Sequence, residues 1–389
     1  MHEESPATSS HPEVGASSPS RASRITAWIA SIVGVLLVIV LVAGFLIHLP
    51  YVVISPGNAT SLNDSISIEG ATTYPHSGGV HYLTVRVSGS DPNVWKLVAS
   101  WLDSDSTVEP RENVVGCLSD GDNISFNARL MQQSQGDATN VALTRLGYAV
   151  TASTPQFVVV DVRRGGTVQQ GELQCGGGPS DGILRVGDQI ETIDEQPVAT
   201  TDSVGALIAT HQPGDVVRVG VVRDATRQTL DVTAGSRTAD DACVPAVKPG
   251  AKPCLGIVVQ QFVQYEFPIQ VNFDIARVGG PSAGLAFALA IIDDLTPGDL
   301  TGGQPVAVTG EIAPNGAVLE VGGVEQKAIT ARTSGVKLMI VPKSEVADAK
   351  KGAGDMKVLG VSTLDEALAA LQEAGGAPVP PPTSTTARS

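Results

Sequence analysis

The longest uncharged run of the chain extends from Ile25 to Ile47 and holds 23 residues, most of them strongly apolar. A helix of this length can cross a bilayer with some tilt. Arg21 and Arg24 precede the run, and clustered positive charge marks the cytoplasmic end of a membrane span. We therefore predict one transmembrane helix over 25–49, a cytoplasmic disordered tail over 1–24, and an extracytoplasmic location for the rest. A secretory signal is the alternative, but the run is long and no small-residue cleavage site follows it.

Apolar residues alternate with other residues in several later stretches, which is the pattern of half-buried strands. The strictest alternation places on one face Phe267, Ile269, Val271, Phe273 and Ile275. Short apolar runs predict further strands at 306–308, 338–341 and 357–361, and Asn315-Gly316 predicts a hairpin turn after the first of them. Because predicted helices separate these strands, the pattern favours an α/β (α+β) fold.

Two predicted helices differ in their apolar faces. From Ala283 to Ile292 no residue is charged and apolar side chains occur on every side, which predicts a buried helix too short to span a bilayer. The helix that begins at Val324 has an apolar stripe at i, i+3, i+4 and i+7, and Lys327 occupies the second of these positions. Glu325 and Gln326 lie off the stripe.

A separate β-rich module is predicted between an early strand and helix, at 83–85 and 131–138, and the late strand at 267–275. Its expected elements are strands at 157–160, around Ile190 and at 216–222, with a short helix at 204–208. The module therefore interrupts the larger α/β fold.

Ser282 is the candidate nucleophile. It lies in Gly279-Gly280-Pro281-Ser282-Ala283-Gly284, a tight turn directly before the buried helix. Free N–H groups and the helix dipole at that end favour a developing oxyanion. The alternative is that Ser282 is only the N-cap of the helix, since serine is a preferred cap residue.

Lys327 is the candidate base. A lysine that faces the core loses hydration, which lowers its pKa and leaves a neutral amine able to accept a serine proton. The alternative is a lysine whose stem covers apolar surface while its ammonium reaches water. Thr309 follows a predicted strand and can aim its hydroxyl at the lysine, although alone it is an ordinary strand threonine.

In this order the motifs resemble the proteolytic domain of the Lon family of serine–lysine peptidases. The matching stretches are GGPSAGLAFALAI, TGEIAPNGAVLEVGGVEQKAITA, and the strand at 338–341 followed by Pro342-Lys343. The resemblance implies that Ser282 is the nucleophile, Lys327 its general base and Thr309 the hydroxyl that holds the lysine. Gly280 and Ala283 flank the nucleophile as supporting residues. Many Lon proteases have an acidic residue where Gly279 stands here.

The inserted module resembles a PDZ domain. Gly182 to Ile190, followed by Ile193-Asp194, is similar to a turn and strand of bacterial PDZ domains. This resemblance implies that an extended peptide binds at a sheet edge beside a helix. Leu146-Gly147-Tyr148 resembles the loop that caps the peptide carboxylate. The alternative, that a glycine merely ends the preceding helix, carries slightly more weight.

The predicted organisation after the membrane helix has five parts. They are an N-terminal segment of the Lon-like fold at 50–150, a PDZ domain at 151–235, a linker at 236–258, the Lon-like proteolytic domain at 259–376 and a disordered tail at 377–389.

Composition excludes several classes of function. The 389 residues include 25 basic and 40 acidic ones, for a net charge of −15, which argues against a nucleic-acid partner. The sequence has no GxxxxGK[ST] loop, so no ATP is expected. Four cysteines on the predicted outer side suggest disulfides with three pairings open: Cys117, Cys175, Cys243 and Cys254. Since none are spaced as CxxC, neither a metal nor another cofactor is expected.

Together these patterns predict an ATP-independent, membrane-anchored, extracytoplasmic serine endopeptidase that cuts protein or peptide substrates. The PDZ domain would recognise substrate tails or gate the site. The resemblance is also compatible with a homo-oligomeric ring. The alternative function is a catalytically silent PDZ scaffold at the cell surface.

Overall fold

The larger of two cores is built around a six-stranded sheet. The computed structural model describes residues 21–89, 91–116, 118–162, 168–169, 172–173, 177–238, 242–275 and 278–380. The order of strands in this sheet is β23 (Lys357–Val361), β22 (Leu338–Pro342), β19 (Pro305–Val308), β3 (Gly79–Val87), β1 (Tyr51–Ser61) and β4 (Thr107–Pro110). The first four strands run parallel to one another, and β1 is antiparallel to both of its neighbours.

Helices cover both faces of this sheet because its central strands are apolar on both. In β19, Val306 and Val308 pack in one buried cluster with α6 (Gly284–Leu295), whereas Ala307 packs on the other face with α7 (Val324–Thr333) and α8 (Val346–Ala353). Beside α6 lie α4 (Asp120–Arg145) and α9 (Leu364–Glu373). The prediction that α6 is buried on every side is confirmed.

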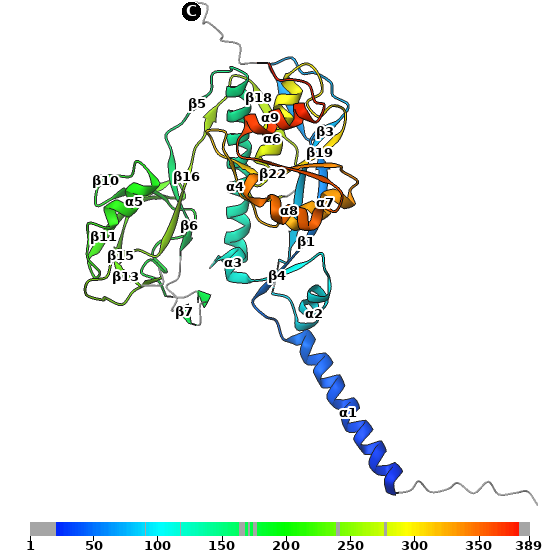
Figure 1. Cartoon of the computed structure of the whole chain (residues 1–389). Coiled ribbons are helices and arrows are strands. Elements are labelled where there is room, and N and C mark those ends of the chain that lie inside the picture. The colour runs from blue at the N-terminus through cyan, green and yellow to red at the C-terminus, as the bar shows by residue number, and fades with distance from the viewer. Residues whose placement is uncertain are drawn as a thin grey trace, which may run out of the picture.

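The smaller core lies under a second sheet, drawn in green to the left of α4 in Figure 1. Its strand order is β12 (Thr226–Thr233), β11 (Val216–Arg223), β9 (Gln189–Ile193), β6 (Gln156–Val162) and β16 (Ile257–Phe262), with β10 (Gln196–Pro197) paired to β9. The short helix α5 (Thr201–Ile208) packs in the same apolar cluster. Strand β16 lies partly in the predicted linker at 236–258 and partly in the predicted proteolytic domain at 259–376. It nevertheless pairs with β6, so the second sheet extends beyond the PDZ boundary predicted at residue 235.

The chain enters and leaves the second sheet along one ribbon. There β5 (Thr151–Ala152) pairs with β17 (Tyr265–Glu266). Just beyond this pair, the Ser153 N–H donates to the Gln264 carbonyl at 2.8 Å, and the Gln264 N–H donates to Ser153 Oγ at 3.0 Å. The insertion thus begins and ends at one hydrogen-bonded pair.

The strand predicted over 267–275 is shorter than its alternation suggests. Only β18 (Gln270–Phe273) is a strand, and it pairs with β2 (Ile66–Glu69). The flanking apolar residues still pack against the larger core, so the alternation correctly identified a buried face. Other short elements are α3 (Arg111–Val115), β7 (Val168–Gln169), β8 (Glu172–Leu173), β13 (Gly235–Arg237), β14 (Cys243–Val244), β15 (Pro253–Cys254), β20 (Glu311–Ile312), β21 (Val318–Leu319) and a 3₁₀ turn (Lys343–Glu345).

At the N-terminal end, α1 (Arg21–Leu46) projects away from both cores, and α2 (Val94–Leu102) lies against its end (Figure 1). Within α1, the stretch Trp28–Leu46 is long and apolar enough to cross a membrane.

Candidate active site

The turn before α6 is pressed against α4. The Gly280 N–H donates to the Asn127 carbonyl at 2.9 Å, and Gly280 has a φ of +88°, a conformation that favours glycine. A Cβ atom at Gly279 would lie 2.8 Å from Asn127 Cβ. Both glycines are therefore needed for this close approach between the turn and the helix.

Two carbonyl groups of the turn are also fixed. The Pro281 carbonyl accepts a hydrogen bond from Ser134 Oγ of α4 at 2.9 Å. The Ser282 carbonyl accepts two, from the Gly310 N–H at 2.9 Å and from Thr309 Oγ1 at 3.1 Å. Because the backbone on both sides of Ser282 is hydrogen-bonded, the position from which the Ser282 side chain projects is fixed.

Helix α6 begins later than predicted. Its N-cap residue is Ala283, and no side chain caps the helix. The Gly284 N–H donates to the Pro281 carbonyl at 3.1 Å, and the Leu285 N–H donates to the Gly310 carbonyl at 3.0 Å. Ser282 therefore lies one residue before the cap, and the alternative in which it is the N-cap is wrong. The first two helical N–H groups are bonded, so the prediction that free helical N–H groups face an oxyanion does not hold for them.

Lys327 lies in the first turn of α7 and is 2 % exposed. Burial lowers the pKa of its amine from 10.5 to about 8, and the negative charge of Glu345 opposes part of this decrease. The predicted core-facing position is thus confirmed, and the snorkelling alternative is not. Gln326 lies off the apolar stripe and is buried as well, because β4 covers it. Its amide is satisfied there by donating to Thr107 Oγ1 of β4 at 2.7 Å.

Glu345 is a site residue that the sequence analysis missed. Its carboxylate accepts a hydrogen bond from the Val321 N–H at 2.9 Å, just before the turn that leads into α7. Burial raises the pKa of Glu345, while the Val321 N–H and the Lys327 charge act to lower it. No sequence pattern distinguishes Glu345 from its neighbours, since it lies in a short polar stretch after the strand at 338–341.

Thr309 connects the turn to the sheet. It is completely buried, and its N–H donates to the Ile340 carbonyl of β22 at 3.0 Å. The alternation of β19 places Thr309 on the same face as Ala307, the face that carries α7. Its hydroxyl was expected to hold Lys327, but here it donates to the Ser282 carbonyl.

Leu146, Gly147 and Tyr148 form the end of α4. The Gly147 N–H donates to the Thr144 carbonyl at 3.0 Å, the Tyr148 N–H donates to the Leu143 carbonyl at 2.9 Å, and Gly147 has a φ of +88°. This is a Schellman motif, as the helix-end alternative expected. The two N–H groups that a peptide carboxylate would need are already bonded within the helix end.

One edge of the second sheet lies at β16. In the order of the second sheet β16 is the last strand, and α5 lies beside it. Gly256, directly before β16, has a φ of +71°, and the buried Leu255 carbonyl accepts from Ser180 Oγ at 2.6 Å. The disulfide Cys243–Cys254 ties down the preceding residues. The other two cysteine candidates, Cys117 and Cys175, lie outside the described residues.

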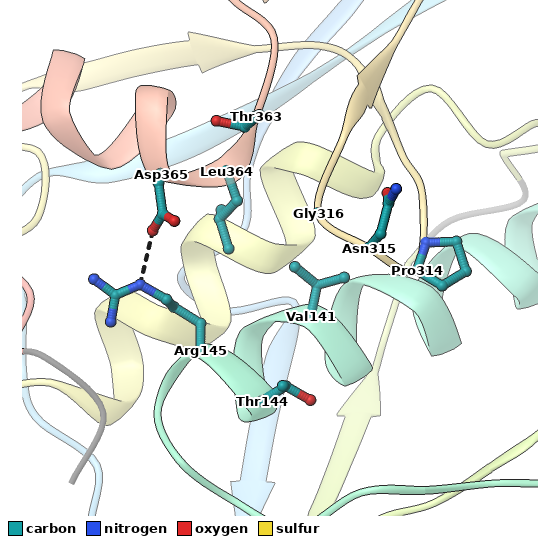
Figure 2. Close-up of a pocket in the computed structure, with 9 residues that line it drawn as sticks. All are labelled: Val141, Thr144, Arg145, Pro314, Asn315, Gly316, Thr363, Leu364 and Asp365. Carbon is teal, nitrogen blue, oxygen red and sulfur yellow. Dashed lines mark hydrogen bonds and ion pairs between the residues drawn. The ribbon is translucent and has the colours of Figure 1, made fainter.

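The cavity in Figure 2 lies elsewhere. It has a volume of about 360 Å³ and is closed on one side by an ion pair, with Arg145 Nε 2.8 Å from Asp365 Oδ1. Its lining comes from the end of α4, the β20–β21 turn and the start of α9, and does not include Ser282 or Lys327. Within the described part of the chain, no group of three histidine, cysteine or acidic side chains is arranged to hold a metal ion.

Comparison with known proteins finds a family match that begins at β9 of the second sheet and extends through the larger core to the end of α9. Residues 189–373 match the model of the Lon protease (S16) C-terminal proteolytic domain. Similar proteins include the Lon protease of Chloroflexus aurantiacus, 30% identical over 203 residues, and that of Phenylobacterium zucineum, 33% identical over 142 residues. These alignments cover 50% and 36% of this chain but only 23% and 16% of the two relatives. Nearly half of the chain is therefore similar to a Lon-type proteolytic domain.

Two solved structures align with about a quarter of the chain. One is the PDZ domain of the SdrC-like protein of Listeria innocua, with 19% identity, coverage of 26% of this chain and 94% of that chain, and a TM-score of 0.18. The other is a solution structure from Geobacillus thermodenitrificans, with 24% identity, coverage of 25% and 97%, and a TM-score of 0.17.

Proposed function

We propose that this chain is a membrane-anchored, ATP-independent serine endopeptidase that cuts proteins through Ser282 and Lys327. The observation that carries the proposal is the burial of Lys327, because a pKa of about 8 leaves about a tenth of the amine neutral at pH 7 and half of it neutral at pH 8. A lysine with its ordinary pKa would be almost fully protonated there and could not act as a base.

The reaction follows from these two groups. Ser282 Oγ attacks the scissile carbonyl while Lys327 Nζ takes the hydroxyl proton, and the resulting ammonium then protonates the leaving amine. An ester between Ser282 and the acyl half of the substrate remains. Lys327 then accepts a proton from the attacking water and returns it to Ser282 Oγ as the ester bond breaks, which releases the carboxylic acid and restores the free serine.

The oxyanion donors come from the turn rather than from the helix. Since the Gly284 and Leu285 N–H groups are bonded to carbonyls, the N–H groups of Ser282 and Ala283 are the candidates for this role. The fixed carbonyls of Pro281 and Ser282 orient these peptide units. This preorganisation is what oxyanion stabilisation needs.

The second sheet is assigned a role in selecting substrates. An extended peptide can add to the free edge of β16 beside α5, as in PDZ recognition. Gly256 gives the backbone before that strand a conformation suited to a tight loop. We propose 151–262 as the PDZ-like unit, a range that includes β16.

The remaining parts of the proposal concern the location of the protein in the membrane and its independence from ATP. The apolar stretch Trp28–Leu46 supports a membrane anchor, and the positive charges of Arg21 and Arg24 favour a cytoplasmic N-terminal end. ATP independence rests on the sequence, which has no phosphate-binding loop. An enzyme without an unfolding motor should cut flexible or unfolded segments.

Cleavage of an unfolded fluorescent casein without ATP tests the proposal. Wild type is compared with Ser282→Ala, Lys327→Ala and Lys337→Ala, the last being an exposed lysine near the end of α7. The proposal requires activity in wild type and Lys337→Ala and its loss in the other two. Activity that survives Ser282→Ala refutes the dyad. Peptide binding without any cleavage favours the silent scaffold.

A further inference from the structure

Helix α2 exposes an apolar face. Trp101 is 81% exposed, Leu102 74% and Val98 42%, and their spacing of i, i+3 and i+4 puts them on one side of the helix. The polar residues Lys96 and Ser100 are also four apart and lie on the opposite side. No residue of α2 is buried. A short helix with this division is typical of a membrane surface.

Contacts with α1 fix where this face lies. The Trp95 indole N–H donates to the Leu41 carbonyl at 2.8 Å, and the ring lies over Gly44, where a Cβ atom would be 2.3 Å from Nε1. Two backbone bonds join the ends of the helices. The Val94 N–H donates to the Ile47 carbonyl at 3.3 Å, and the Leu49 N–H donates to the Pro92 carbonyl at 3.1 Å.

These contacts place the start of α2 inside the apolar span. Leu41 lies five residues before the last residue of Trp28–Leu46, which corresponds to about 8 Å along the helix axis. Interfacial helices bury their apolar face about 5–10 Å into the boundary between headgroups and acyl chains. The position of Trp95 on α1 therefore agrees with the depth at which such a helix lies.

We propose that α2 is an interfacial helix and that Val98, Trp101 and Leu102 insert into the lipid at the extracytoplasmic surface of the membrane that α1 crosses. The inference rests on the membrane anchor of the proposed function. Lipid is the occupant that the structure favours, because the face continues from the contact between Trp95 and the apolar span. Lys96 and Ser100 then face the headgroups and water.

The position of α2 on the membrane is connected to the catalytic core through β4. Strand β4 follows α2 in sequence, pairs with β1, and receives the Gln326 amide at Thr107 Oγ1. Gln326 precedes Lys327 in α7. The chain from α2 into β4, together with the hydrogen bond between Gln326 and Thr107, thus links the membrane-bound helix to the helix that carries the candidate base. The sheet is therefore held at a set height above the bilayer.

Fluorescent labelling of the full chain in phosphatidylcholine vesicles tests the inference. An environment-sensitive dye is attached to Leu102→Cys on the apolar face and, as a matched control, to Ser100→Cys on the polar face. Val35→Cys, in the middle of α1, reports on the anchor. Vesicles with a nitroxide on the lipid acyl chains quench dyes that touch lipid.

We expect a blue-shifted emission at position 102 and nitroxide quenching about twofold or more above that at position 100. Quenching at position 35 with equal, weak quenching at 100 and 102 overturns the inference and leaves the anchor intact. A blue shift at 102 without quenching also overturns it, because a second protein then covers the face. Absence of quenching at position 35 refutes the anchor and the inference together.

Discussion

Replacing Lys327 with methionine should abolish proteolysis and at the same time stabilise the fold. Methionine has a similar length and no charge, so it fills the site of the lysine without the cost of desolvating an amine. Loss of the base should lower kcat/KM by roughly a thousandfold or more. The gain in stability follows from the pKa of the lysine, because a lowered pKa in the folded state means that folding opposes protonation.

The size of the gain can be worked out from the two pKa values. In the unfolded chain the pKa is the ordinary 10.5, and in the folded protein it is about 8. The difference corresponds to about 3 kcal/mol at pH 7, where the unfolded chain carries the proton and the folded site resists it. As the pH rises through 8 toward 10.5 this cost disappears. The advantage of Lys327→Met should therefore fall to about 1 kcal/mol near pH 10.

Urea unfolding of a soluble fragment that begins at Tyr51 measures this difference at the two pH values. Lys337→Met is the control, since that lysine is exposed and its replacement should give no gain that depends on pH. A Lys327→Met variant that is no more stable than wild type at pH 7, or whose gain is the same at pH 10, would refute the reasoning. Either result would mean that the amine keeps its charge in the folded protein.

Three further predictions concern the surroundings of the site. Glu345→Gln removes the negative charge that raises the pKa of Lys327. The pH at which kcat/KM reaches half of its maximum should therefore move below about 8. A shift to higher pH contradicts the role of Lys327 as the base. Thr309→Val removes one hydrogen bond to the turn, so kcat should fall while urea unfolding shows a loss of about 1 kcal/mol. The double replacement Cys243→Ser with Cys254→Ser opens a loop with a sequence separation of 11, next to the second sheet. It should cost about 3 kcal/mol in thermal unfolding of the inserted unit, with cleavage of unfolded casein retained.

Local sequence signals predicted the elements that local chemistry determines. Asn315-Gly316 predicted the turn between β20 and β21, and Gly316 has a φ of +81° as such a turn requires. The apolar stripe of α7 predicted that Lys327 faces the core. Thr363 followed by Glu366 is a local helix-start signal, and the Thr363 hydroxyl accepts from the Glu366 N–H at 3.2 Å at the start of α9.

Features that depend on distant parts of the chain were not predictable in this way. Gln326 lies off the apolar stripe, and only the approach of β4 explains why it is buried. Strand β16 joins β6 across a separation of about a hundred residues, so no local pattern assigns it to the second sheet. Glu345 acts on Lys327 through space, from a turn that follows a different strand.

The shared anchoring point of the second sheet makes that unit an exchangeable cassette. Ser153 and Gln264 are hydrogen-bonded to each other, so the entry and the exit of the insertion occupy neighbouring positions on the catalytic body. The insertion also packs on α4, because Val158, Val160 and Phe262 share a buried cluster with Phe126 and Leu130. A replacement module must therefore keep an apolar face toward α4. Under the proposed function, exchange of this one module changes which polypeptides reach the protease while the larger core keeps its architecture.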